Sequence, residues 1–345
     1  MKPRDRDFIK TKEGFFFCAI GYTHPKDRII SYIKYVPKKG GKWAGKYDRV
    51  MPSYTMLNLL KNLYNLKEYY PHYVYNSKVF NTMISAVPYN YIKHYYHPDR
   101  KIQQLLRKEK KDRIQEATVN LVEYLSKEAK VPIVNFGITG SILINIHHPI
   151  LSDIDIIVYG YKNALKVKEA IIQLYNEDRL IHRLSSKRLE EWCKDKASTY
   201  PLTINEAKGI YNRKWNYGIF EDYNFSIHPV KLNNEIFEEY GDTLYIPKGM
   251  IQIEGEISDT SQSLFLPHTY HVKNISIKEG LKVNDIKEVS SYESLYGDIM
   301  KLGERFIAYG KLEKVVNVKS GEEYHRVLIG SLEAGGKDYI KPKYL

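Results

Sequence analysis

Residues 136–160 have the sequence FGITGSILINIHHPILSDIDIIVYG, and this stretch decides the fold predicted for the middle of the chain. Apolar runs bounded by glycine predict a strand over residues 133–139 and a second strand over residues 152–160. A helix is predicted to open at Gly140, and an amphipathic helix is predicted over residues 163–177. This alternation of strand and helix predicts an α/β unit.

Two acidic residues alternate with apolar ones at the start of the second predicted strand. Because successive side chains of a strand point to opposite faces, Asp153 and Asp155 share one face, and Ile154 and Ile156 share the other. Neighbouring carboxylates repel each other unless a cation lies between them. Mg²⁺ suits this position because it binds through one or two carboxylates together with substrate phosphates. The pattern therefore predicts a site for Mg²⁺, or for Mn²⁺ in its place.

Gly140 and Ser141 lie at the predicted junction of strand and helix. Backbone amides at the start of a helix favour an anion, and glycine lets the anion approach the backbone closely. The Ser141 hydroxyl can donate to a phosphate oxygen. We therefore predict that these two residues bind a nucleotide, although a glycine and a serine that only cap a helix would give the same pattern.

This block resembles the motif of the nucleotidyltransferase superfamily to which DNA polymerase beta belongs. The motif has an apolar residue, then Gly with Gly or Ser, about a dozen residues, and then acid, apolar, acid, apolar; Ile138, Gly140, Ser141 and residues 153–156 fit it. The resemblance is specific over residues 131–160 and extends to about residue 232. The flanking segments are most similar to uncharacterised archaeal proteins described as predicted nucleotidyltransferases.

The resemblance implies a reaction and a cofactor. The family transfers a nucleoside monophosphate from an NTP to a hydroxyl and releases pyrophosphate. By this resemblance, Asp153 and Asp155 are catalytic residues and metal ligands for Mg²⁺ or Mn²⁺. Such catalysis needs positioning and charge neutralisation more than covalent chemistry.

The family's active members carry a third carboxylate on a neighbouring strand, and this chain departs from that pattern. The candidate strand, YNFSIHPV (223–230), has Ser226 and His228 where an acid would lie. We assign the third catalytic position to Asp222, with Glu221 and His228 as open alternatives. For His228, an ordinary strand histidine is favoured over a catalytic one.

Triphosphate contacts beyond Ser141 are assigned to Arg213 and Lys214, because arginine suits bidentate phosphate contacts. Lys187 and Arg188 form a second candidate pair, and surface cations would explain either pair as well. His147 and His148 precede Asp153 and are candidates for substrate contact rather than metal binding, because Mg²⁺ prefers oxygen ligands.

The positive charge is concentrated in the first third of the chain. The whole chain has 53 Lys and Arg, 41 Asp and Glu, and a net charge of +12. Residues 1–110 have 22 Lys and Arg and 8 Asp and Glu, a net charge of +14. The other 235 residues have 31 basic and 33 acidic residues, a net charge of −2. Fourteen of the 31 tyrosines are interleaved with these cations. Cations among aromatic rings predict a nucleic-acid surface, although tyrosines in a core with lysines outside it would have the same composition.

We predict an α+β multidomain protein with three parts. Residues 1–110 form a basic, tyrosine-rich α+β region, residues 111–245 the nucleotidyltransferase α/β core, and residues 246–345 a C-terminal β-domain. Five strand-like runs after Pro247 predict a small barrel of the oligonucleotide-binding type, although an unrelated five-stranded sheet would give the same runs. Cys18 and Cys193 lie too far apart for a metal knuckle and are expected to be buried thiols.

The leading prediction is a cytoplasmic, Mg²⁺-dependent enzyme that adds a nucleotide to a nucleic acid, with RNA preferred over DNA. No apolar segment predicts a signal peptide or a membrane helix, so no membrane partner is predicted. The alternative is a nucleic-acid-binding protein whose core binds Mg-NTP but has impaired catalysis. A third possibility, transfer to a small molecule, predicts no salt-dependent binding of nucleic acid.

Overall fold

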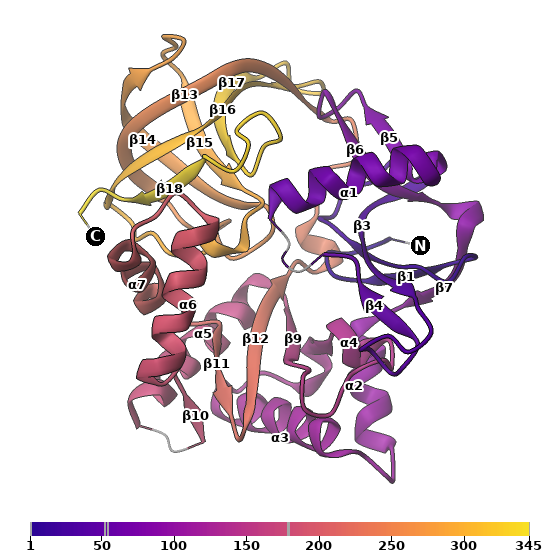
Figure 1. Cartoon of the computed structure of the whole chain (residues 1–345). Coiled ribbons are helices and arrows are strands. Elements are labelled where there is room, and N and C mark those ends of the chain that lie inside the picture. Colours follow the sequence, from indigo (N-terminus) through magenta and orange to yellow (C-terminus); the bar gives the residue numbers. More distant parts are fainter. Residues whose placement is uncertain (1, 52, 54, 178–179, 345) are drawn as a thin grey trace.

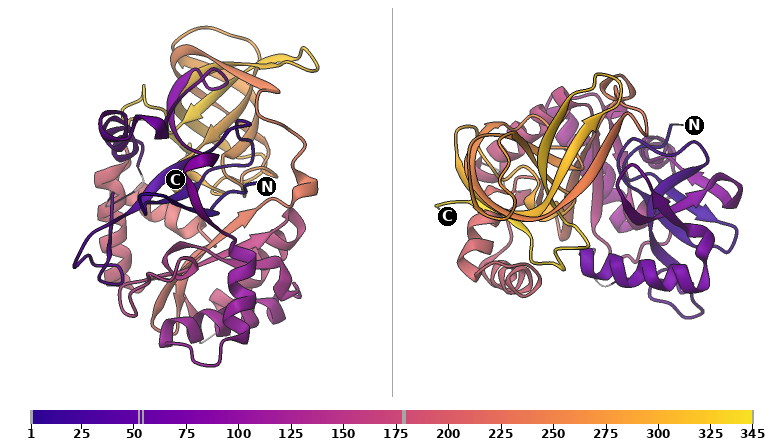
Figure 2. Two further views of the ribbon diagram at one scale, coloured as in Figure 1. Left: turned by 90° about the vertical axis from the view of Figure 1, so that its right-hand side faces the viewer. Right: turned by 90° about the horizontal axis from the view of Figure 1, so that it is seen from above.

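The computed structural model describes residues 2–51, 53, 55–177 and 180–344, which form three β-sheets with helices around them. The sheets follow one another along the chain and are called here the N-terminal, core and C-terminal sheets. In the orientation of Figure 1, the N-terminal and C-terminal sheets lie side by side above the core sheet, and Figure 2 shows the same arrangement from two further directions. The chain is therefore a mixed α and β protein with several separate cores.

The N-terminal sheet is antiparallel and has its own apolar core. Its strands are β1 (Phe8–Thr11), β2 (Phe16–Ala19), β3 (Arg28–Pro37), β4 (Tyr47–Arg49), β5 (Val74–Ser77), β6 (Thr82–Pro88) and β7 (Ile92–Tyr96). Their order is β5-β6-β3-β2-β1-β7, with β4 paired to β3. Helix α1 (Met56–Tyr69) begins after Thr55, whose side chain accepts a hydrogen bond from the Asn58 amide, so Thr55 caps this helix.

The core sheet contains the two strands predicted in the middle of the chain. Its order is β10-β11-β12-β9-β8, and β9 and β12 run parallel. The strands are β8 (Phe136–Ile138), β9 (Ile154–Tyr159), β10 (Ile181–His182), β11 (Tyr217–Phe220) and β12 (Tyr223–Val230). The helices around it are α2 (Pro98–Arg107), α3 (Arg113–Glu128), α4 (Gly140–Leu143), α5 (Tyr161–Glu177), α6 (Ser186–Thr199) and α7 (Ile204–Arg213). The helix predicted at Gly140 is α4, and it has only four residues.

The two faces of the core sheet differ in polarity. Ile154 and Ile156 of β9 are fully buried in one apolar cluster with Phe225 and Ile227 of β12. Apolar residues of α3 and α5 complete this cluster, so these helices cover that face. By strand alternation, Asp155 projects from the opposite face. The hydrophobic effect thus fixes which way the acidic residues point.

The C-terminal sheet contains strands at all five predicted runs and one more. They are β13 (Thr243–Asp259), β14 (His268–Glu279), β15 (Ile286–Ser291), β16 (Arg305–Asn317), β17 (Glu323–Ile329) and β18 (Tyr339–Pro342). Their order is β13-β14-β15-β17-β16-β18, and β13 also pairs with β16. These pairings close a circuit of hydrogen-bonded strands through β13, β14, β15, β17 and β16.

Two further expectations concern single residues and membrane helices. Cys18 and Cys193 are free and buried, as predicted. No helix in the described part of the chain is long and apolar enough to cross a membrane.

A buried ion pair inside the C-terminal sheet gives a first testable prediction. The side chains of Glu313 and Arg326 are 2% and 4% exposed, their closest charged atoms are 2.8 Å apart, and Lys311 also contacts Glu313 at 3.0 Å. Removing one charge of a buried pair leaves its partner desolvated and uncompensated, at a cost of about 3 to 5 kcal/mol. We expect Glu313→Gln to lower the free energy of unfolding in urea by this amount.

The matched control uses a surface pair between the same two strands. Glu323 contacts Lys314 at 2.7 Å, but its side chain is 51% exposed. Glu323→Gln should cost less than about 1 kcal/mol, because exposed ion pairs contribute little. Equal losses in the two variants would show that burial of Glu313 does not determine its contribution.

Candidate functional site

Polar side chains from two parallel strands meet on the open face of the core sheet. Asp153 immediately precedes β9 and Asp155 lies within it. On β12, Ser226 is the register partner of Asp155, and Asn224 and His228 share its face by strand alternation. Five polar residues are therefore collected at one end of two adjacent strands.

The position of Asp155 depends on Gly140. Gly140 has φ of +66°, a left-handed conformation that favours glycine, and it starts the short helix α4. A Cβ atom at this position would lie 2.1 Å from Asp155 Oδ2. The absence of a side chain at residue 140 thus leaves the space that the Asp155 carboxylate occupies.

A chain of hydrogen bonds orients Asp155 from the neighbouring strand. The Ser226 hydroxyl donates to Asp155 Oδ1 at 2.6 Å, and His228 Nε2 lies 2.8 Å from Ser226 Oγ. Because a hydroxyl has only one proton, Ser226 must accept from His228, which places the histidine proton on Nε2. The ring and the hydroxyl together hold the carboxylate in one orientation.

The protonation behaviour of the two aspartates differs. Burial acts to raise the pKa of Asp155, but the neighbouring His228 ring, whose Nε2 lies 3.7 Å from Asp155 Oδ1, the charge of Lys34 and the Ser226 hydroxyl outweigh it and lower this pKa. Asp153 is reached by solvent, yet the protein around its carboxylate displaces much of its hydration. This desolvation, followed by the charge of Asp155, raises the pKa of Asp153 to about 6.

His228 is uncharged at neutral pH. Burial, followed by the charge of Arg6, lowers the pKa of His228 to about 4, and Asp155 only partly opposes these two effects. The ring therefore acts as a neutral hydrogen-bond donor to Ser226 and adds no positive charge beside Asp155.

The positive charges near the aspartates come from the N-terminal sheet. Lys34 of β3 and Arg49 of β4 both lower the pKa of Asp153, and the charge of Arg6 acts on Asp155. Arg6 has φ of +66°, which is uncommon for a residue with a side chain, and its carbonyl accepts a hydrogen bond of 2.8 Å from Thr139, the residue before Gly140. The N-terminal sheet is thus anchored beside the aspartates and contributes the cations of the site.

The donor atoms on this face fit a hard divalent cation. Asn224 Nδ2 lies 3.4 Å from Asp153 Oδ1, and the carbonyl oxygen of the same amide is buried without a hydrogen-bond partner among the described residues. Carboxylate and amide oxygens are ligands that Mg²⁺ and Ca²⁺ accept. A third acidic ligand is missing, because the described ranges contain no group of three His, Cys, Asp or Glu side chains that could hold a metal ion.

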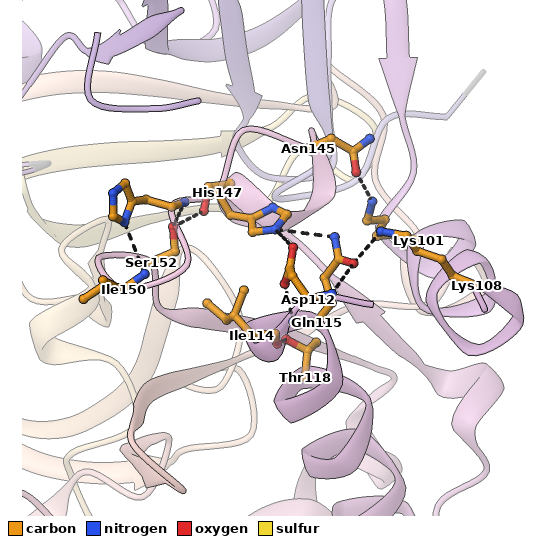
Figure 3. Close-up of polar contacts among 12 residues, drawn as sticks. Lys101, Lys108, Asp112, Ile114, Gln115, Thr118, Asn145, His147, Ile150 and Ser152 are labelled. Atoms are coloured by element: carbon orange, nitrogen blue, oxygen red, sulfur yellow. Dashed lines mark hydrogen bonds and ion pairs between the residues drawn. The ribbon is translucent and has the colours of Figure 1, made fainter. Parts of the chain in front are cut away.

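The loop before Asp153 is held by the serine and the histidine that the sequence singled out. Ser141 is 5% exposed, and its hydroxyl lies 3.0 Å from that of Ser152, which accepts a hydrogen bond from the His148 amide. His147 Nε2 contacts the carboxylate of Asp112, the N-cap of α3, at 2.8 Å. Figure 3 shows the contact between His147 and Asp112. Ser141 and both histidines therefore bind groups of the protein itself.

The remaining predicted residues are directed elsewhere. Asp222 lies in the turn before β12 and forms an exposed ion pair with Arg113 of α3, the helix on the other side of the sheet. Arg213 binds Glu304 through two nitrogens, and buried Lys214 donates to the carbonyls of Ser294 and Gly297. These contacts join α7 to the C-terminal sheet, and none of the three side chains contacts Asp153 or Asp155.

Two groups of site residues were missed by sequence reasoning. Asn224 belongs to the same alternation as Ser226 and His228, so the pattern YNFSIHPV could have identified it. Arg6, Lys34 and Arg49 had no such signal, because only tertiary packing brings them to the core sheet.

Comparison with known proteins gives one relative along the whole chain. No family model and no solved structure matches the sequence. The chain is 30% identical over 348 residues to "Uncharacterized protein MJ1086" of Methanocaldococcus jannaschii. The alignment covers 99% of this chain and 100% of that protein. The chain belongs to the same family. The predicted similarity to an archaeal protein is thereby confirmed, and it spans the residues of all three sheets.

The contact between Gly140 and Asp155 is testable by one added methyl group. Gly140→Ala places Cβ on the carboxylate, so Asp155 must rotate and lose its bond from Ser226. Gly321→Ala is the matched control, because Gly321 has φ of +73° but open space around it. Both variants carry the left-handed backbone cost of about 1 to 2 kcal/mol.

We expect Gly140→Ala to be more destabilising by a further 1 to 3 kcal/mol, roughly the value of a hydrogen bond to a charged group. Urea unfolding of the two variants measures this difference. Equal destabilisation would mean that the carboxylate does not need the space beside residue 140.

Proposed function

We propose that the protein is a Mg²⁺-dependent nucleotidyltransferase that transfers a nucleoside monophosphate from an NTP to a hydroxyl of a nucleic acid, RNA in preference to DNA. The observation that carries this proposal is the placement of Asp153 and Asp155 on one face of the core sheet, with Asp155 seated against Gly140. Gly140, Asp153 and Asp155 are also positions of the nucleotidyltransferase motif. This agreement between motif and geometry supports the assignment.

Each residue of the chain has a defined part in this proposal. Asp153 and Asp155 would hold the divalent cation, and the amide oxygen of Asn224 would join them after its amide group turns from the present contact, in which Nδ2 faces Asp153. Ser226 and His228 would keep Asp155 oriented, since their hydrogen bonds fix its Oδ1. When bound, the cation would neutralise phosphate charge and bring the triphosphate to the carboxylates. Lys34, Arg6 and Arg49 lie on the side of the N-terminal sheet and would balance the remaining negative charge.

The second candidate function is a nucleic-acid-binding protein with a catalytically impaired core that still binds Mg-NTP. One observation favours it: Ser226 stands on β12 opposite Asp155, where a third carboxylate would otherwise reach the cation. The hydroxyl also uses an oxygen of Asp155 as its acceptor. A site with two carboxylates carries less negative charge and would hold the cation more weakly.

The finer division of the fold belongs to the same proposal. We assign residues 1–110 to the basic region, residues 111–245 to the nucleotidyltransferase core and residues 246–345 to a barrel of the oligonucleotide-binding type. The closed circuit of pairings through β13, β14, β15, β17 and β16 supports the last assignment, because five strands in a partly open barrel are typical of that fold.

The proposed function is tested by nucleotide incorporation. Each labelled NTP is incubated with Mg²⁺ or Mn²⁺ and a pool of cellular RNA and DNA, with the wild type, Asp153→Asn/Asp155→Asn, and Asp222→Asn as a matched control. We expect polymer labelling by the wild type and by Asp222→Asn, and none by the double variant. Labelling by the double variant would exclude this site, and no labelling by any protein, with Mg-NTP binding retained, would favour the second candidate function.

Substitution of Asn224 tests the third ligand directly. Asn224→Asp restores a carboxylate beside Asp153, so we expect tighter Mn²⁺ binding in calorimetry, by about tenfold or more, since a charged ligand adds at least about 1.4 kcal/mol in a partly desolvated site. Asn224→Ala removes the unpaired carbonyl oxygen and should weaken binding. Unchanged Mn²⁺ affinity in both variants would show that residue 224 lies outside the cation site.

A further inference from the structure

We propose that three exposed lysines of the β3–β4 hairpin bind the phosphodiester backbone of a single nucleic-acid strand and guide it to Asp153. The residues are Lys39, Lys42 and Lys46, called here the hairpin lysines. This inference rests on the proposed function, because it takes a nucleic acid as the acceptor. It adds the surface that binds the acceptor and the kind of contact that this surface makes.

The hairpin is fixed against the loop that leads into Asp153. Trp43, in the turn between β3 and β4, is 8% exposed and packs in one apolar cluster with Leu143, Ile144 and Ile146, which belong to α4 and the loop after it. Figure 1 shows β4 beside α4. Because the loop after α4 ends at Asp153, this packing places the hairpin next to the candidate site.

Arg49 forms the link between the hairpin and the aspartates. Its guanidinium lies 4.4 Å from the centre of the Trp43 ring. Trp43 in turn packs in the apolar cluster of the segment that leads into Asp153. Positive charge therefore continues from the solvent-exposed hairpin toward the candidate site.

The hairpin has a defined shape. Asp48 accepts hydrogen bonds from the Lys42 amide at 2.8 Å and from Lys38 Nζ at 2.5 Å, and the Gly40 amide donates to the Gly45 carbonyl at 3.0 Å. A Cβ at Gly41 would lie 2.3 Å from the Tyr47 carbonyl oxygen, so the chain doubles back too closely for any side chain there. This internal bonding fixes the backbone that carries the hairpin lysines before a ligand binds, which lowers the entropic cost of ordering that backbone on binding.

The hairpin lysines have no ion-pair partner in the part of the chain that the structure describes, whereas Lys38 is paired with Asp48. All three are exposed and lie within eight residues of one another. Like charges at this spacing repel, and a polyanion that contacts all three relieves the repulsion while releasing its own counterions. A nucleic-acid strand provides such a run of phosphates.

The aromatic residues of this region do not form a stacking surface for bases. Tyr35 is fully buried, and Trp43 is covered on one face by Arg49 and packed into the apolar cluster. The half-buried Tyr47 packs its ring against Phe16 of the same cluster. Stacking on bases requires open rings. The hairpin therefore contacts phosphates rather than bases, and its binding should be independent of base sequence.

Salt dependence of binding tests this inference. Fluorescence anisotropy measures the affinity of single-stranded RNA and DNA oligonucleotides of two unrelated sequences for the wild type and for Lys39→Gln/Lys42→Gln/Lys46→Gln. Each phosphate contact adds about 0.7 to the slope of log affinity against log salt for single strands. We expect the triple variant to lower the slope by about 2 for both sequences, with no change in the unfolding midpoint.

The matched control is Lys127→Gln/Lys162→Gln/Lys166→Gln. These lysines are equally exposed, and they lie on α3 and α5, the helices that cover the opposite face of the core sheet. The control should keep the wild-type slope. An unchanged slope in the hairpin variant, an equal loss in the control, or no binding of either oligonucleotide by the wild type would each overturn the inference.

Calorimetry of Mg-NTP binding on the same proteins separates this inference from the proposed function. The hairpin variant is expected to keep the wild-type affinity for Mg-NTP, because the hairpin lysines do not contact Asp153 or Asp155. Loss of the salt slope in a protein that neither binds Mg-NTP nor incorporates nucleotide would sustain the hairpin as a nucleic-acid surface and reject the transferase. Normal Mg-NTP binding together with an unchanged salt slope in the hairpin variant would reject the hairpin as a nucleic-acid surface and leave the transferase proposal standing.

Discussion

The candidate site depends on one steric fact: the Asp155 carboxylate occupies the space in which a side chain of residue 140 would lie. Residue 140 must therefore be glycine, and its left-handed conformation turns the chain from β8 into the short helix α4. The same carboxylate accepts a hydrogen bond from the Ser226 hydroxyl on the neighbouring parallel strand. A single close approach thus joins the turn, β9 and β12, and burial of Ile154 and Ile156 behind them prevents the strand from turning over.

The N-terminal sheet contributes positive charge to the face of the core sheet that carries the aspartates. Desolvation, followed by the charge of Asp155, raises the pKa of Asp153. Arg6, Lys34 and Arg49 bring positive charge to the same face. The core sheet thus supplies the acidic residues of this face, and the N-terminal sheet supplies the basic residues beside them. In the proposed function, the triphosphate would bring negative charge and its cation positive charge. The balance between the aspartates and the three basic residues would then keep its sign.

The C-terminal sheet is connected to the core by buried polar contacts. Asp298 accepts hydrogen bonds from Trp215 and Lys168 at 2.7 Å each, and Arg213 and Lys214 bind the same region through Glu304 and backbone carbonyls. Desolvated polar groups need such partners, because an unpaired one is costly. Arg213 and Lys214, which the sequence alone suggested as phosphate ligands, therefore serve as partners for these buried polar groups.

Local sequence patterns predicted the strand that carries Asp155, the short helix after Gly140, and the five principal strands after Pro247. These features are local, because strand period, turn chemistry and apolar patterning act over a few residues. Local pattern also indicated Ser226 and His228, but it could not show that Ser226 donates to Asp155 or that Asp222 pairs with Arg113.

The cations beside the aspartates follow from packing between distant segments and not from any local pattern. Lys34 and Arg49 are more than a hundred residues from Asp153 in the chain and reach it because Trp43 packs against Ile144 and Ile146. Arg213 and Lys214, which are nearer in sequence to β12, turn to the C-terminal sheet instead. The physical reason is that charge acts over distance in space, and the distance is set by apolar packing between segments that carry no common sequence pattern.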